Sequence, residues 1–172
     1  SPHTLPLHDA LPISSGCASS KTIMMTGPDG RIVVAFNLLK GGQPVYTVIY
    51  RDTAVITGGN LGIIRSDADF SSGLKLDSFT GPEEVRDNYT LLHGKKKEIS
   101  GSALRYTVHL SASTGEMMEI IFRISDDGFA FCYNFPSASE EMKYITAEKS
   151  SFGFAEGTLA WIQPRAASKS GW

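Results

Sequence analysis

The residues of this chain that could do acid–base chemistry are three neighbouring carboxylate pairs, Glu83-Glu84, Asp126-Asp127 and Glu140-Glu141. Paired carboxylates are what glycoside hydrolysis and other general acid–base reactions require. Neighbouring side chains on a strand point to opposite faces, so the members of such a pair do not converge on one substrate. Because two pairs lie in polar stretches and the third lies in a turn sequence, we interpret all three as solvated structure. We therefore assign no catalytic residue within the chain.

Other reaction chemistries find little support in the residue types. His93 and His109 have no His or Cys at metal-ligand spacing, so no metal site is predicted. Residue types alone leave a Ser-His-Asp arrangement open, but the sequence has no Gly-x-Ser-x-Gly elbow and no phosphate-binding Gly-rich loop before a helix. The run of lysines at 95–97 could attract anions or could simply be a solvated sheet edge.

Aromatic and polar residues near the end of the chain could bind a sugar. Trp161 and Trp172 offer flat rings that would cover the C–H face of a pyranose, and Gln163 and Arg165 would bond its hydroxyls. Trp161, Gln163 and Arg165 are therefore our candidate substrate-binding residues. The alternative for Trp161 is burial in the hydrophobic core.

Length and composition fit one globular domain. The 172 residues are 41% apolar and 20% charged, with a formal net charge of −2, so nucleic acid is not an expected partner. No run of about 18 apolar residues is present, so no transmembrane segment is predicted. The two cysteines, Cys17 and Cys132, are not expected to form a disulfide. Cys132 alternates with aromatic residues, and we expect it to be a small buried hydrophobic residue.

Residues 1–20 differ in composition from the rest and form a separate leader. We interpret residues 3–13 as the translation of a sequencing adaptor, so His3 and His8 are not considered as ligands. The small residues around Cys17 resemble the end of a bacterial lipoprotein signal, in which Cys17 would carry the lipid. The alternative for this stretch is a disordered linker.

From residue 21 the chain consists of short alternating segments separated by turn residues, which predicts an all-β antiparallel sandwich or barrel. No window of a dozen residues has a helical period. The segment 44–50 is apolar on both faces and is placed inside the sandwich. Gly58-Gly59-Asn60 is predicted to be a turn, and the polar segment 82–99 an exposed strand or loop at a sheet edge. The expected strands are residues 22–26, 31–38, 44–50, 52–57, 61–65, 74–79, 104–110 and 144–151.

The most apolar part of the chain is residues 117–135, which we predict to be a hairpin at the centre of a sheet. Alternate residues place Met118, Ile120, Phe122 and Ile124 on one face of the first arm and Phe129, Phe131, Tyr133 and Phe135 on one face of the second. Between the arms, Asp127-Gly128 is a strong hairpin signal, because glycine adopts a positive φ without steric cost. So apolar a hairpin needs a second sheet to cover it.

Three segments together resemble the amino-terminal domain of glycoside hydrolase family 97. They are Thr26-Gly27-Pro28-Asp29-Gly30-Arg31-Ile32-Val33-Val34-Ala35-Phe36-Asn37-Leu38, Gly42-Gln43-Pro44-Val45-Tyr46-Thr47-Val48-Ile49-Tyr50 and Phe122-Arg123-Ile124-Ser125-Asp126-Asp127-Gly128-Phe129-Ala130-Phe131-Cys132-Tyr133-Asn134-Phe135-Pro136. Their order and spacing agree with that family, and the similarity covers residues 21–172.

The resemblance implies an incomplete antiparallel β-super-sandwich of the galactose mutarotase type, which precedes a catalytic TIM barrel absent from this chain. It implies an exo-acting α-glucosidase or α-galactosidase, exported by bacteria to the periplasm or outer membrane. Calcium would be bound at the active site of the parent enzyme, through residues that follow this chain, and an α-linked oligosaccharide would be bound through the missing barrel. The fragment itself is expected to be inactive and to bind no metal.

A second interpretation is a free-standing carbohydrate-binding or structural β-sandwich lipoprotein. The coding sequence after Trp172 distinguishes the two interpretations, because only the first requires a barrel of repeated strand-helix units. The sequence leaves the oligomeric state open.

Overall fold

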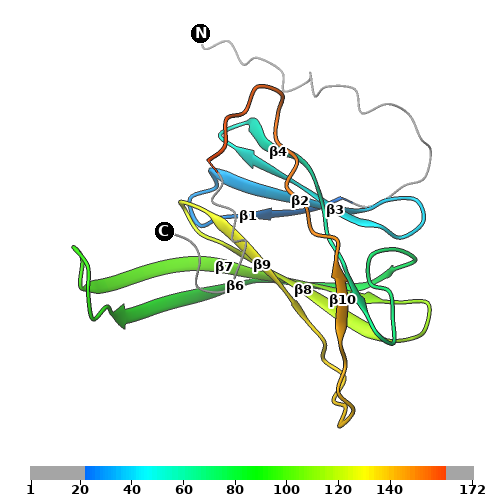
Figure 1. Cartoon of the computed structure of the whole chain (residues 1–172). Helices are drawn as coiled ribbons and strands as arrows, with labels where there is room; N and C mark the ends of the chain where they lie inside the picture. The colour runs from blue at the N-terminus through cyan, green and yellow to red at the C-terminus, as the bar shows by residue number, and fades with distance from the viewer. Residues whose placement is uncertain (1–21, 162–172) are drawn as a thin grey trace.

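The computed structural model describes residues 22–161, which form antiparallel β-sheets and contain no helix (Figure 1). Two sheets have four strands each, in the orders β1-β2-β3-β4 and β6-β7-β8-β9, and β5 pairs with β10. The all-β prediction is therefore confirmed. The strands are β1 (Ile23–Thr26), β2 (Ile32–Leu38), β3 (Pro44–Tyr50), β4 (Thr53–Asn60), β5 (Ile63–Arg65), β6 (Lys75–Thr90), β7 (Glu98–Ser111), β8 (Met117–Ile124), β9 (Phe129–Asn134) and β10 (Ile145–Glu148).

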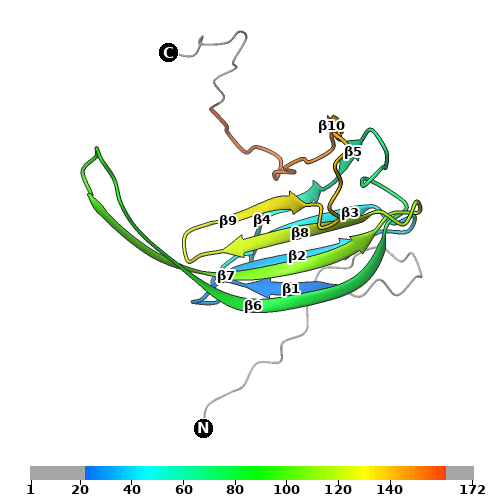
Figure 2. The ribbon, with the colours of Figure 1, turned by 90° about the horizontal axis from the view of Figure 1, so that it is seen from below.

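The two four-stranded sheets lie face to face, and the hydrophobic core lies between them (Figure 2). On β8 every second residue is buried, as the alternation predicts, and these residues are Met118, Ile120, Phe122 and Ile124. Phe122 of the second sheet meets Phe36 of the first edge to face, with 6.2 Å between ring centroids. The Tyr106 hydroxyl donates to the carbonyl oxygen of Thr26 at 2.9 Å, which ties β7 to β1. The antiparallel sandwich is thus the architecture of the described residues.

The hairpin of β8 and β9 forms as predicted, but it does not lie at the centre of a sheet. Within residues 22–161, β9 is the outermost strand of its sheet, so of the two arms of the hairpin only β8 has a strand on each side. The side chains of β9 alternate between half-buried aromatic residues and exposed residues. Cys132 is one of the exposed residues, so the prediction that it is buried is wrong. The reason is that no layer of the described structure covers the outer face of β9.

The turn chemistry also differs from the prediction. Gly128 closes the β8–β9 turn, in which the Ser125 N–H donates to its carbonyl oxygen at 2.9 Å, but it does not have a positive φ. The left-handed conformation occurs instead at Arg51 and Asp52, with φ of 46° and 65°, between β3 and β4. Two successive left-handed residues are typical of the tight hairpin turn that matches the twist of its strands. Neither residue is glycine, the residue type that most often marks such a turn.

Gly58-Gly59-Asn60 is not a turn, because β4 continues through all three residues. A Cβ atom at Gly59 would lie 2.1 Å from Cε1 of Tyr46 and 2.8 Å from the carbonyl oxygen of Ser151. Tyr46 is 1% exposed, and its hydroxyl donates to that same carbonyl at 3.2 Å. Gly59 therefore allows the buried Tyr46 ring to pack directly against the backbone of β4. Its role is to leave space for this ring and not to form a turn.

We expect Gly59→Ala to lower the free energy of unfolding by about 1–3 kcal/mol, because the buried Tyr46 ring has no room to move. Chemical denaturation followed by circular dichroism would measure the change. Gly58→Ala is the matched control, since a Cβ atom there meets no atom within 4 Å. Equal effects of the two substitutions would contradict the steric explanation.

Residues 145–154, which we name the strap, close one side of the first sheet. β10 pairs with β5, and the chain then runs beside β4, where the Ser151 N–H donates to Asn60 at 3.0 Å and the Thr57 N–H donates to Gly153 at 2.8 Å. This strap places the exposed side chains of Phe152 and Phe154 next to the edge of the sandwich.

Candidate functional site

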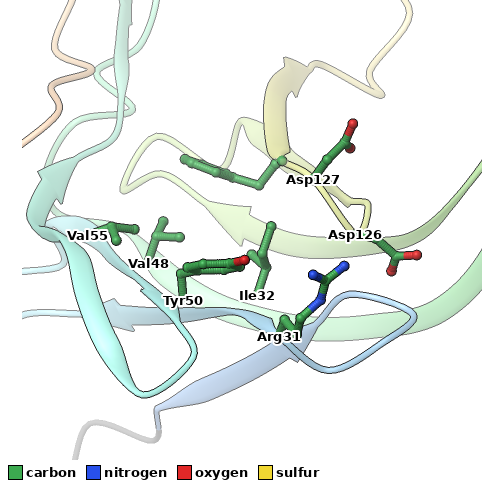
Figure 3. A pocket seen from close by; sticks show the side chains of 9 residues that line it. Arg31, Ile32, Val48, Tyr50, Val55, Asp126 and Asp127 are labelled. Atoms are coloured by element: carbon green, nitrogen blue, oxygen red, sulfur yellow. The ribbon is translucent and has the colours of Figure 1, made fainter.

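An open cleft of about 500 Å³ lies where the first sheet faces the turn between β8 and β9 (Figure 3). Its apolar side consists of Ile32, Val48 and Val55 from the first sheet together with the ring of Tyr50. Phe129 completes the lining from β9. Flat rings beside apolar side chains form a surface against which the C–H face of a sugar could stack.

Charged groups gather at one end of this cleft. In Figure 3 the guanidinium of Arg31 extends toward the Asp126 side of the turn. Arg31 forms an ion pair with Asp29, and the backbone N–H of Asp29 donates to Oδ1 of Asp126 at 3.0 Å. The Asp29 carboxylate accepts hydrogen bonds from the backbone N–H and from the guanidinium of Arg31. These bonds, the backbone one most strongly, lower the pKa of that carboxyl below its usual value. The cleft thus combines aromatic surface with ionised hydrogen-bonding groups.

The carboxylates of the cleft do not form an acid–base pair. Asp126 and Asp127 are adjacent in the turn and point in different directions (Figure 3). Oδ1 of Asp126 accepts from the Asp29 N–H, and Oδ1 of Asp127 accepts from the Ser125 hydroxyl at 2.8 Å. Both groups therefore hold the turn in place.

A second aromatic group lies on the same side of the sandwich. Tyr46 contacts Phe129 and Phe131 of β9 with centroid distances of 5.8 and 5.7 Å, and Phe152 of the strap lies 6.1 Å from Phe131. Burial raises the pKa of Tyr46 to about 12, and its hydroxyl donates to the carbonyl oxygen of Ser151. Phe152 is 52% exposed, so this aromatic surface is open to solvent at its rim.

The predicted sugar-binding residues are only partly described by the structure. Trp161 is 91% exposed, so it is not a core residue, contrary to the alternative considered from the sequence. Gln163 and Arg165 lie outside the described residues, as do Trp172 and the lipidation candidate Cys17. Whether Trp161 acts together with Gln163 and Arg165 therefore stays a prediction.

Strand register builds a polar row that the sequence analysis missed. Thr80 Oγ1 lies 3.3 Å from Nε2 of His109, and Nδ1 of His109 lies 3.1 Å from Oε1 of Glu119. Asn134 donates to the other oxygen of Glu119 at 2.7 Å. The order hydroxyl, imidazole, carboxylate resembles a nucleophile with its base and orienting acid. The four residues come from β6, β7, β8 and β9, which are neighbours in one sheet, so we interpret the row as a cross-strand ladder.

Arg65 is a buried charged side chain, with 8% exposure, at the junction of the small sheet and the β7–β8 turn. Its guanidinium contacts Asp67 at 2.6 and 2.9 Å and Glu116 at 2.8 Å. It also lies over the rings of Phe70 and Phe135, at 5.2 and 4.5 Å from their centroids. Two carboxylates and two aromatic rings therefore surround this cation, which fits a structural role.

Among residues 22–161, no three His, Cys, Asp or Glu side chains are grouped in a way that could hold a metal ion. No helix long and apolar enough to cross a membrane is found in the described residues either.

Comparison with known proteins gives consistent matches. A family model described as glycosyl-hydrolase 97 N-terminal matches residues 25–171. A probable retaining alpha-galactosidase from Streptomyces bingchenggensis (strain BCW-1) is 28% identical over 110 residues, which are 63% of this chain and 16% of that protein.

Solved structures with the same fold include a beta-arabinopyranosidase, with 26% identity and a TM-score of 0.72 over 78% of this chain and 21% of that chain. A glycoside hydrolase family 97 enzyme from Pseudoalteromonas sp. strain K8 in complex with panose has a TM-score of 0.68 at 20% identity, over 78% of this chain and 20% of that chain. The same enzyme in complex with acarbose gives a TM-score of 0.69 at 20% identity, with equal coverage. This chain therefore spans between 16% and 21% of the length of these relatives.

Proposed function

Because this chain belongs to the family of glycosyl-hydrolase 97 N-terminal domains, we propose that it is the non-catalytic amino-terminal domain of an exo-acting α-glycoside hydrolase. Its role is to support a catalytic TIM barrel and to contribute carbohydrate binding. The family match over residues 25–171 carries this proposal. The paired carboxylates of the cleft support it, because Asp126 and Asp127 are engaged in local hydrogen bonds and do not converge.

The substrate of the parent enzyme is proposed to be an α-glucoside or an α-galactoside. The Streptomyces relative is named as an alpha-galactosidase, and the Pseudoalteromonas enzyme was solved with panose and with acarbose. Calcium is proposed to be bound by the barrel, and the protein to be exported to the periplasm or outer membrane. Support for contact with the barrel comes from exposed apolar side chains on and after the strap, which are Phe152, Phe154, Leu159 and Trp161.

We expect the 172-residue chain to hydrolyse no aryl α-glucoside and no aryl α-galactoside, even with calcium added, because Asp126 and Asp127, the two carboxylates of the cleft, are held by separate local hydrogen bonds and do not converge on one substrate. Release of the aryl group, followed by absorbance, is the measurement. The same chain, extended through the coding sequence that follows Trp172, is the positive control. Turnover by the 172-residue chain that survives purification and falls in Asp126→Asn would contradict the proposal.

Carbohydrate binding has two suitable places in the chain, the cleft beside Tyr50 and the surface around Trp161. Titration calorimetry with panose and with acarbose would measure binding, and Tyr50→Ala and Trp161→Ala would separate the two places. Tyr89→Ala is the matched control, because Tyr89 is 52% exposed and lies far along β6, away from both. Absence of binding to both sugars would limit the function to support of the barrel.

The second candidate function is a free-standing carbohydrate-binding β-sandwich. The observation that favours it is the cleft itself, which combines the rings of Tyr50 and Phe129 with the charged group of Arg31. A stop codon soon after Trp172 in the coding sequence would support this candidate over the first.

A further inference from the structure

The hairpin formed by β6 and β7 extends well beyond the body of the sandwich as a free two-stranded ribbon (Figures 1 and 2). The two strands remain paired out to Thr90 and Glu98, and the Leu91 N–H donates to the carbonyl oxygen of Lys97 at 2.8 Å. The residues 91–97 between them, which we name the ribbon tip, are all exposed. The segment 82–99 is thus an exposed sheet edge, as the sequence predicted.

Most charges along the ribbon are neutralised by neighbours. Arg105 contacts Glu83 at 2.6 Å, Arg86 contacts Glu84 at 2.7 Å, and Arg123 of β8 forms an ion pair with Asp87. At the ribbon tip the situation is different. Among residues 22–161, no ion pair includes any of the three consecutive lysines at 95–97. Positive charge is therefore concentrated at the far end of the ribbon, in a chain whose formal net charge is −2.

Two leucines lie at the same end. Leu91 is 38% exposed and Leu92 is 92% exposed, which makes Leu92 one of the most exposed apolar side chains among the described residues. A sheet edge protected by charge alone does not need leucines at its tip. A soluble polyanion would be attracted by the lysines but would leave the leucines in water. A bilayer with anionic lipids satisfies both groups, because apolar side chains enter the boundary of the acyl chains while lysines remain among the headgroups.

We propose that the ribbon tip is a contact site for an anionic membrane surface. Leu91 and Leu92 insert at the interface, and Lys95, Lys96 and Lys97 interact with the lipid phosphates. Because the ribbon projects from the body, the tip reaches a flat surface before the sheets do (Figure 2). The contact is individually weak and reversible, as expected for one short apolar insertion combined with three basic residues.

Co-sedimentation of the 172-residue chain with vesicles tests this proposal. We expect binding to phosphatidylcholine vesicles that contain 30% phosphatidylglycerol, and at least tenfold weaker binding to phosphatidylcholine alone. Exchange of the lysines at 95–97 for glutamine should weaken binding about fivefold per lysine, and Leu91→Ser with Leu92→Ser should weaken it about tenfold or more. The matched control exchanges Lys40, Lys75 and Lys149 for glutamine, which should leave binding unchanged. None of these exposed substitutions is expected to alter the circular dichroism spectrum.

A second measurement reports the depth of the tip. In Leu92→Trp, brominated lipids should quench more fluorescence than in the unchanged chain. The proposal would be overturned if the chain did not bind anionic vesicles, or if the leucine substitutions left binding unchanged. It would also be overturned if the control lysine variant lost as much binding as the variant at 95–97. Binding to heparin that depended on the leucines would also contradict their insertion into a bilayer. A leucine-dependent association with a soluble acidic protein in place of vesicles would also contradict a membrane contact.

Discussion

Replacement of Arg65 by alanine is expected to lower the free energy of unfolding by about 2–4 kcal/mol. The side chain is buried among Asp67, Glu116 and the rings of Phe70 and Phe135, so its removal deletes two ion pairs and two cation–π contacts at once. The expected loss of stability is not larger than this because Asp67 and Glu116 are 25% and 40% exposed, so water can solvate both carboxylates when the arginine is absent. Urea denaturation of both proteins at pH 7 would measure the difference.

Arg105→Ala is the matched control for this prediction. Arg105 pairs with Glu83 on the solvated face of the ribbon, where an ion pair contributes between about 0 and 1 kcal/mol. A loss in Arg65→Ala no larger than that in Arg105→Ala would contradict the structural role of Arg65.

The pH dependence offers an independent readout for Arg65. Its hydrogen bonds to Asp67 lower the pKa of that carboxyl. A carboxyl whose pKa is lower in the folded state stabilises the fold above its unfolded pKa of about 3.9, and this contribution is lost as the pH falls through the folded value. Stability of the unchanged chain should therefore decline in that acidic range, and Arg65→Ala should show a smaller decline.

Phe122→Ala is expected to cost about 3–5 kcal/mol, the range for removal of a large side chain from a core that cannot collapse. Phe122 is fully buried on β8 and contacts both Phe36 of the opposite sheet and Phe131 of β9, each with 6.2 Å between centroids. The vacated space thus lies where both sheets and the edge strand meet. Thermal and chemical unfolding would both measure the loss.

Leu92→Ala provides the comparison, since Leu92 is 92% exposed and should change stability by less than about 0.5 kcal/mol. If Phe122→Ala were as mild as Leu92→Ala, the two sheets could not be packed against each other through this ring.

The fold class could be predicted because strand side chains alternate with a period of two residues. This period correctly placed Met118, Ile120, Phe122 and Ile124 on the core face of β8, and it located β2 and β3 to within one residue. For β7 it identified only residues 104–110 of a strand that begins at Glu98. The polar composition of residues 82–99 likewise indicated the exposed edge that the ribbon occupies. The family resemblance rested on the same segments and agrees with the family match over residues 25–171.

Turns and glycines were less predictable, because one residue type serves several purposes. Gly59 was expected in a turn but lies within β4, where the Tyr46 ring leaves no room for a side chain. The left-handed turn formed at Arg51 and Asp52, where strand pairing compensates for an unfavourable local conformation. Cys132 had the alternation of a core strand, but it lies on the exposed face of β9, the outermost strand of its sheet among residues 22–161.

By itself, therefore, the sequence determined that the described chain is a two-faced antiparallel β-structure with no converging carboxylate pair on adjacent residues. Only the tertiary structure decided which distant residues meet. The cleft joins Arg31 and Tyr50 to the turn at Asp126, and the polar row joins Thr80 to His109 and Glu119. Such contacts depend on strand order and register, which are fixed by cooperative packing of the whole core, and no local pattern of residues encodes them.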